Sequence, residues 1–196
     1  HVAEQYMEFF TDERCGYCTP CRVGNVLLKQ RLADIRAGRG SLEDLAYLES
    51  LGGLHEGVVL LHMTTPSREL VRRASRARAP LVLTPRADLR DTGRLPPLVA
   101  FLEEGCRVAL GTAMGPRSSV LREAAELHAA YPEVPAMVLL AAATAGGADA
   151  LGLHGLGTLD VGAAPGLLHA DVGSTVPDDP CGWLLRAGEP PLSWRS

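Results

Sequence analysis

Three cysteines lie within seven residues near the start of the chain. Cys15, Cys18 and Cys21 occur at every third position, on a segment that also carries Gly16 and Pro20. Ordinary packing does not require this spacing, whereas thiolates spaced in this way hold soft metal centres. The spacing alone leaves three chemistries open: a 4Fe-4S cluster, a zinc site with a distant fourth ligand, and a redox dithiol. A fourth interpretation is three thiols that hold no metal.

Two helical patterns flank these thiols. Apolar residues recur at helical spacing from Val2 to Phe10 and again from Arg22 to about Arg36, where Gly38 and Gly40 end the second pattern. Cys21 therefore stands at a predicted helix N-terminus. The positive end of the helix dipole favours thiolate over thiol at this place, which suits a metal ligand.

A further helix is predicted from Ser41. Asp44 is placed to complete a capping box with Ser41, and leucines then recur on one face at positions 42, 45, 48 and 51. This helix and the one before it are expected to form a hairpin that shields the thiol loop from water.

Composition excludes several classes of protein. The chain has 196 residues and a formal charge of −4, so it lacks the basic surface typical of nucleic-acid binding. No apolar run approaches the roughly 20 residues that a membrane-spanning helix needs. Five cysteines, three of them clustered, indicate metal binding in a reducing compartment rather than disulfides, so we expect a cytoplasmic protein. The chain opens at His1 within a helical pattern, and we expect this N-terminus to be a cut edge.

The pattern changes at residues 52–53. Short, almost continuously apolar runs alternate with amphipathic helical patterns, which is typical of a parallel sheet covered by helices. The predicted strands are residues 57–62, 80–84 and 107–110, and the predicted helices are residues 67–78, 95–104 and 117–130. Polar residues follow the strands, at the carboxyl edge where such sheets keep their chemistry.

The stretch FFTDERCGYCTPCRVGNVLLKQRLADIRAGRGSLEDLAYLESL resembles the iron–sulfur segment of the flavin-bearing subunit of NADH dehydrogenase, and the diaphorase subunit of NAD-reducing hydrogenase. The aromatic pair, the acidic pair, the cysteine motif and the glycine turn all occur in the same order. The resemblance implies a 4Fe-4S cluster bound by Cys15, Cys18 and Cys21. It also implies electron transfer beside a flavin domain, with other subunits of a redox complex as partners.

The fourth thiolate of that family has no counterpart at its usual place. The family carries it in a Cys-Gly-Leu-Gly turn, and this chain has Leu-Leu-His-Met at residues 60–63. His62 is the candidate substitute there. Cys106 and Cys181 are more typical of a small core residue and a free thiol. The resemblance therefore supplies three of the four ligands that such a cluster takes.

A second resemblance covers residues 55–172. The segments VVLLHMT, LVLTPRADL, VALGTAM and AMVLLAAATAGGADALGLHGLGTLDVG resemble the C-terminal part of the amidohydrolase superfamily, nearest to cytosine deaminases and chlorohydrolases. This implies the last three βα units of a TIM barrel and a short β return. His62 would then be the strand-six histidine that binds metal or substrate.

The hydrolytic site implied by this second family is incomplete. Ala113 stands where the family has a metal-binding, proton-transferring aspartate, and the Pro-Arg-Ala-Asp of residues 85–88 replaces Pro-Arg-Ser-Asn. The family's strand-one His-x-His pair and strand-five histidine have no counterpart. Alanine can neither bind Zn²⁺ nor accept a proton, so we expect no hydrolysis by this chain alone.

Together these observations predict a mixed fold. We expect an all-α iron–sulfur segment at residues 1–52, a partial amidohydrolase-like α/β barrel at 53–175, and a Pro- and Gly-rich, partly ordered tail at 176–196. The function expected is that of an iron–sulfur electron-transfer segment joined to a catalytically incomplete hydrolase segment. The alternatives are a metal-dependent amidohydrolase and a non-catalytic fusion remnant. Open sheet edges predict self-association.

Overall fold

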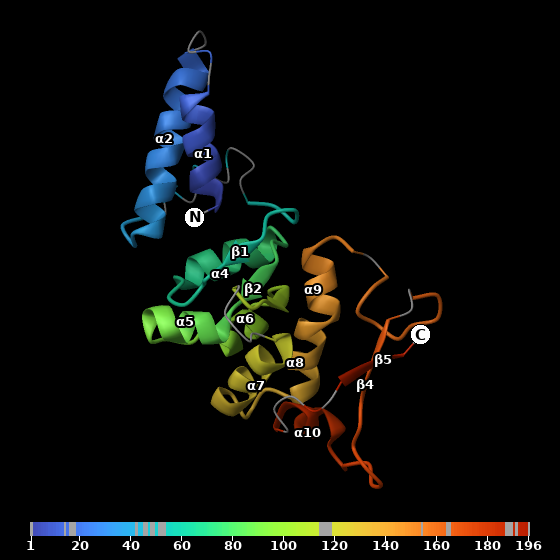
Figure 1. Cartoon of the computed structure of the whole chain (residues 1–196). Helices are drawn as coiled ribbons and strands as arrows, with labels where there is room; N and C mark the ends of the chain where they lie inside the picture. Colours follow the sequence, from blue (N-terminus) through green and yellow to red (C-terminus); the bar gives the residue numbers. More distant parts are fainter. Residues whose placement is uncertain are drawn as a thin grey trace. The chain divides into compact units, whose positions relative to one another are not determined.

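The computed structural model describes residues 2–13, 15, 19–41, 43–44, 47, 50, 54–113, 119–153, 155–163, 166–186, 190 and 192–195. The chain divides into two compact units, His1–Gly53 and Leu54–Ser196 (Figure 1).

The described part of the first unit contains the helices α1 (Val2–Asp12) and α2 (Thr19–Arg36). Two ion pairs fix their antiparallel arrangement, because Glu4 near the start of α1 meets Arg36 at the end of α2, and Glu8 meets Lys29 at 2.8 Å. Figure 1 shows the two helices side by side. Both were predicted, although α2 begins before the expected Arg22.

Backbone geometry ends α2 where the glycines predict it. Gly38 has φ +72°, a left-handed conformation that only glycine adopts at little cost. The capping box is also confirmed. The Ser41 backbone N–H donates to Asp44 Oδ2 at 2.8 Å, and the Asp44 N–H donates to Ser41 Oγ at 3.2 Å. The leucines at 42, 45, 48 and 51, and with them the predicted hairpin, lie outside the described residues.

The described part of the second unit is mixed α/β. In chain order its elements are β1 (Leu60–Leu61), α4 (Arg68–Arg76), β2 (Leu81–Leu83), α5 (Pro85–Thr92), α6 (Leu98–Glu103), β3 (Val108–Leu110), α7 (Val120–Ala130), α8 (Ala136–Ala143), α9 (Ala145–Ala150), β4 (Leu167–Ala170), α10 (Pro180–Arg186) and β5 (Leu192–Arg195).

The first three strands form a parallel sheet in the order β1-β2-β3, with Leu60 opposite Leu81 and Leu83 opposite Leu110. The three strands and their parallel pairing follow the predicted alternation of apolar runs and helices. β4 and β5 form a separate antiparallel pair. The strands are shorter than predicted because only their central residues pair.

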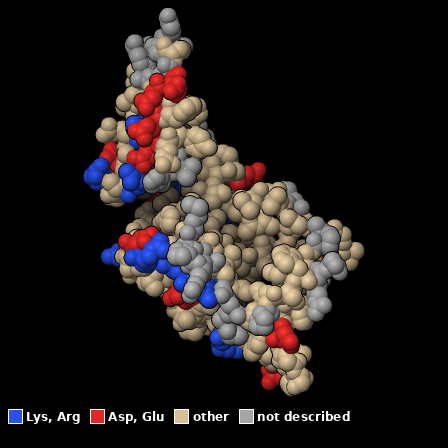
Figure 2. All heavy atoms as spheres, viewed as in Figure 1, with Lys and Arg blue, Asp and Glu red and all other residues tan. Residues whose placement is uncertain are grey.

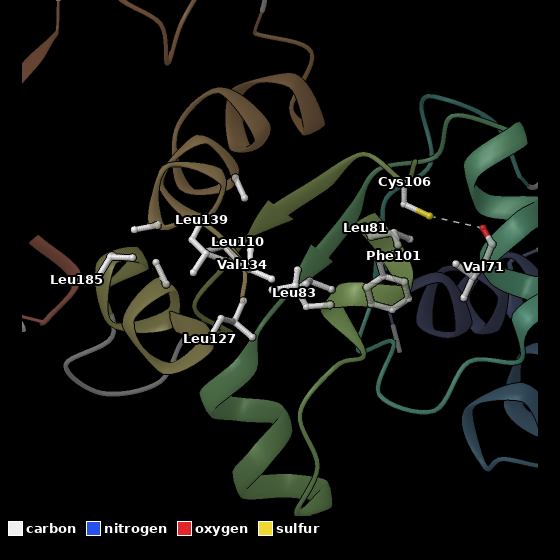
Figure 3. Close-up of a cluster of buried hydrophobic side chains, with 14 of the residues drawn as sticks. Val71, Leu81, Leu83, Phe101, Cys106, Leu110, Leu127, Val134, Leu139 and Leu185 are labelled. Atoms are coloured by element: carbon white, nitrogen blue, oxygen red, sulfur yellow. Dashed lines mark hydrogen bonds between the residues drawn. The ribbon is translucent and has the colours of Figure 1, made fainter. Parts of the chain in front are cut away.

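One apolar core joins the sheet to its helices (Figure 3). Leu81 and Leu83 of β2 are fully buried, as are Phe101 of α6, Leu127 of α7 and Leu139 of α8. Each buried leucine or phenylalanine of this size contributes about 1.5 to 3 kcal/mol through removal from water. This packing holds the carboxyl ends of the strands in place.

Two helices of the second unit differ from the prediction. α5 occupies residues that we expected to form only the loop after β2, because proline is typical of turns as well as of the first position of a helix, where Pro85 lies. The predicted partly ordered tail contains α10, whose Leu185 is 2% exposed and belongs to the core. A short helix in a Pro-rich segment gives no clear periodicity in the sequence, which explains this error.

The predicted open edges concern β1 and β3. Within the part of the chain that the structure describes, each pairs with β2 alone. α9 nevertheless lies tightly against β3, because a Cβ atom at Gly146 would overlap the carbonyl oxygen of Val108. Some of the β3 backbone is therefore covered by the chain itself.

Candidate functional site

The predicted cluster ligands lie at the start of α2. Cys15 is exposed and precedes the helix, and Cys21 falls within its first turn because α2 begins at Thr19. Cys18 lies outside the described residues. The unpaired N–H groups of a helix N-terminus carry a partial positive charge, which favours anionic thiolates beside it.

The two remaining cysteines belong to the second unit. Cys106 is 9% exposed, its Sγ lies 3.6 Å from the Val71 carbonyl oxygen, and burial raises the pKa of its thiol. This agrees with the prediction of a small core residue, although β3 begins two residues later than Cys106. Cys181 is half-buried at the start of α10 and packs against the core.

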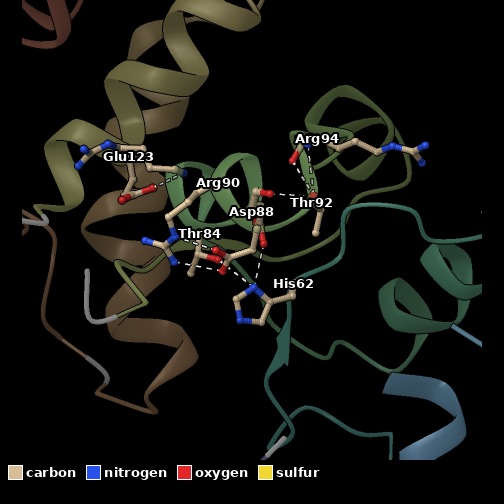
Figure 4. A network of polar contacts seen from close by, with 9 residues as sticks. His62, Thr84, Asp88, Arg90, Thr92, Arg94 and Glu123 are labelled. Atoms are coloured by element: carbon tan, nitrogen blue, oxygen red, sulfur yellow. Dashed lines mark hydrogen bonds and ion pairs between the residues drawn. The ribbon is translucent and has the colours of Figure 1, made fainter. Parts of the chain in front are cut away.

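A polar cluster lies at the carboxyl edge of the parallel sheet (Figure 4). His62 directly follows β1, and Thr84 directly follows β2. Parallel strands end at a common edge, so these side chains meet although 22 residues separate them. Ala113 follows β3 at the same edge and contributes no functional group.

His62 contacts two residues through one ring nitrogen. Its Nδ1 lies 2.8 Å from Oδ1 of Asp88 and 3.2 Å from Oγ1 of Thr84. Asp88 belongs to the first turn of α5 and is only 1% exposed, whereas the His62 side chain is 54% exposed. Asp88 Oδ2 is buried without a hydrogen-bond partner among the described residues. An exposed imidazole is thus held by a buried carboxyl group.

A second buried carboxyl group supports α5 from the neighbouring helix α7. Glu123 of α7 is 1% exposed, and its Oε2 accepts a hydrogen bond of 2.8 Å from the backbone N–H of Arg86. Thr84, the N-cap residue of α5, makes no side-chain capping bond. Glu123 therefore caps α5 from another helix. Burial raises the pKa of Glu123, and the Arg86 N–H opposes this by favouring the carboxylate.

Backbone strain is concentrated at the same edge. His62 has φ +56° and Ala113 has φ +44°, conformations that side-chain-bearing residues adopt infrequently. Such conformations cost of the order of 1 to 3 kcal/mol and persist only where the surrounding structure imposes them. The strand ends are therefore positioned by packing rather than by local preference.

Neither a metal-ligand cluster nor a membrane-spanning helix occurs among the described residues. No group of three or more His, Cys, Asp or Glu side chains comes together in a metal-binding arrangement in this part of the chain. None of the helices formed by these residues has the length and apolar character that crossing a bilayer requires.

Arginine side chains gather over α4 and α5, with acidic side chains among them (Figure 2). Arg68 and Arg72 of α4 share Glu104, each at 3.3 Å, and Arg73 pairs with Glu69 in the same helix. These pairs fit the interpretation of this arginine-rich helix as a solvated face.

Sequence reasoning missed the roles of two residues in this site. Asp88 was noted only for replacing an asparagine, and Glu123 was not considered. The position of Asp88 four residues after Thr84, with Pro85 as a helix start, is the signal that would have placed its carboxyl group under the strand end. No local signal points to Glu123, because its partner is 37 residues away.

Comparison with protein families matches residues 1–74 to the iron–sulfur binding region of NADH-ubiquinone oxidoreductase-F. The match is shorter than half the chain and extends past Gly53 into α4. The corresponding protein of the NADH-quinone oxidoreductase of Streptomyces coelicolor is 47% identical over 47 residues, which cover 24% of this chain and 10% of that protein. The first resemblance is therefore confirmed.

The second unit is similar to amidohydrolase-type proteins. Imidazolonepropionase of Bdellovibrio bacteriovorus is 33% identical over 119 residues, covering 56% of this chain and 27% of that protein. Atrazine chlorohydrolase TrzN of Arthrobacter aurescens TC1, solved with zinc, superposes with a TM-score of 0.62 at 25% identity, covering 93% of this chain and 43% of that structure. The second resemblance is confirmed, and the chain spans less than half the length of each of these three proteins.

Proposed function

We propose that residues 1–52 bind a 4Fe-4S cluster through Cys15, Cys18 and Cys21 and transfer single electrons within a redox complex. The match of this segment to an iron–sulfur binding region is the observation that carries the proposal. The donor set agrees with it, because three thiolates next to a helix N-terminus suit iron and sulfide. A reducing, cytoplasmic location follows from the same chemistry.

The fourth ligand is the distinctive feature of this proposal. The matched region includes residues 60–63, where β1 and His62 stand in place of the family's cysteine turn. A cluster held by three thiolates would leave one iron for a non-thiolate ligand, and His62 is the candidate from this chain. Iron–sulfur clusters with histidine ligands have raised reduction potentials.

Anaerobic reconstitution with iron and sulfide, followed by low-temperature EPR of the reduced protein, tests the proposal. We expect a cluster signal in the wild type that disappears in Cys15→Ser, Cys18→Ser and Cys21→Ser. The matched controls Cys106→Ser and Cys181→Ser should keep it. If the wild type gives no signal, or if the three loop variants retain it, the segment does not hold a cluster. Zinc without sulfide in anaerobically purified protein would favour the zinc alternative for the same loop.

For the second unit we propose the last three βα units of an amidohydrolase-type barrel, at residues 53–175, with residues 176–196 as its C-terminal extension. The parallel order β1-β2-β3 and the similarity to the chlorohydrolase support this. Its incomplete donor set favours a docking or remnant role over hydrolysis, and self-association through β1 is part of the proposal. Sedimentation velocity of the whole chain, with and without Leu61→Lys, tests the last point.

A further inference from the structure

Two histidines of the second unit make opposite hydrogen bonds through the same ring atom. Nδ1 of His62 lies 2.8 Å from Oδ1 of Asp88. Nδ1 of His55 instead accepts a hydrogen bond of 3.1 Å from the backbone N–H of Gly57. The chain therefore contains a matched pair of exposed imidazoles that differ in the partner of one nitrogen.

These partners determine where each neutral ring carries its proton. A carboxylate can only accept, so Nδ1 of His62 must donate, and Nε2 then keeps its lone pair. A backbone N–H can only donate, so Nδ1 of His55 has the lone pair and Nε2 carries the proton. Thr84 does not change this assignment, because its hydroxyl can share the His62 proton as a second acceptor.

The carboxyl group behind His62 is firmly held. The Asp88 backbone N–H donates to the Thr84 carbonyl at 2.8 Å, and the Thr92 hydroxyl donates to the Asp88 carbonyl at 2.7 Å. Asp88 is buried while His62 is half exposed, and Figure 4 shows the second ring nitrogen of His62 pointing away from Asp88. This is a preorganised arrangement in which a fixed carboxylate orients an accessible imidazole.

We propose that Nε2 of His62 is a nucleophile for small activated acyl compounds such as aryl esters, and that Asp88 is its positioning residue. The Nε2 lone pair bonds to the acyl carbon, and the ester C–O bond breaks to release the aryloxide. Water then adds to the acyl carbon and the C–N bond breaks. This step releases the carboxylic acid and restores the neutral imidazole.

Carbethoxylation by diethyl pyrocarbonate, mapped by peptide mass spectrometry, tests the nucleophile directly. The reaction is run about one pH unit above the ordinary histidine pKa of about 6.5, so that neutral rings predominate. We expect His62 to react ahead of His55, which serves as the internal control. Asp88→Asn should slow His62 by about tenfold, as the loss of an orienting partner does at other imidazoles, and leave His55 unchanged.

Two further measurements complete the test. Nitrogen-15 NMR should show the Nδ1–H tautomer at His62 and the Nε2–H tautomer at His55, and the His62 pattern should change in Asp88→Asn. Release of p-nitrophenolate from p-nitrophenyl acetate should fall to the background of free imidazole in His62→Ala. An Nε2–H tautomer at His62, equal modification of both histidines, or equal ester hydrolysis by wild type and His62→Ala would overturn the proposal. No iron is needed, so the outcome is independent of the cluster.

Discussion

Replacement of Glu123 tests whether a buried carboxyl group on α7 caps α5. Two variants separate its contributions. Glu123→Gln keeps the size of the side chain and an oxygen that can accept from Arg86, whereas Glu123→Ala removes both. Because Glu123 is 1% exposed and its hydrogen bond measures 2.8 Å, the structure predicts clearly different results for the two.

The expected loss for Glu123→Ala is about 2 kcal/mol of unfolding free energy. Hydrogen bonds to charged groups contribute about 1.5 to 3 kcal/mol, and loss of a helix cap costs about 0.5 to 2 kcal/mol, so these two estimates of the same contact agree. Glu123→Gln should cost less than about 1 kcal/mol near neutral pH, since a weaker neutral bond is offset by relief from burying a charge.

The wild type and Glu123→Gln should also respond differently to pH. Burial raises the pKa of Glu123 in the folded state, so the folded protein binds a proton more tightly than the unfolded chain. The contribution of Glu123 is then complete below the ordinary glutamate pKa of about 4.3 and is lost as the pH rises through the higher folded value. Glu123→Gln does not titrate, so its stability relative to the wild type should increase over this interval.

Urea unfolding at several pH values, followed by tryptophan fluorescence, measures both effects. The two tryptophans, Trp183 and Trp194, lie in the second unit and report on it alone. Midpoints are compared at constant slope. The reasoning is refuted if Glu123→Ala is as stable as the wild type, or if Glu123→Gln loses stability relative to the wild type as the pH rises.

Three further changes test the packing and the edge of the sheet. Gly146→Ala should destabilise the second unit by about 1 to 3 kcal/mol, because the new methyl group would overlap the carbonyl oxygen of Val108, whereas Gly147→Ala, with no atom near its Cβ, should stabilise α9 by about 0.5 to 1 kcal/mol in the same urea assay. Leu185→Ala should cost about 2 to 5 kcal/mol by thermal or urea unfolding, and a cost near zero would return α10 to the status of a loose tail. Ala113→Asp adds a carboxylate to the sheet edge at φ +44°, where aspartate is better tolerated than alanine, and we expect it to gain zinc binding in calorimetry that the wild type lacks; if it binds no zinc, the hydrolase alternative loses its support.

Local chemistry in the sequence determined much of this protein. Thiol spacing, the capping box and the glycine after α2 are interactions between residues a few positions apart, so the residue types alone specify them. The order of β1, β2 and β3 was likewise readable, because apolar runs that alternate with helical patterns predict a parallel sheet. The similarity to two families could be recognised from the same short motifs.

Only the tertiary structure decided which polar groups meet. Asp88 lies 26 residues from His62, and Glu123 lies 37 residues from Arg86, so no periodicity or motif connects either pair. Sheet pairing brings the first pair to one edge, and packing of α5 on α7 brings the second together. Burial then gives these carboxyl groups their properties, since removal from water depends on the whole core rather than on neighbours in the chain.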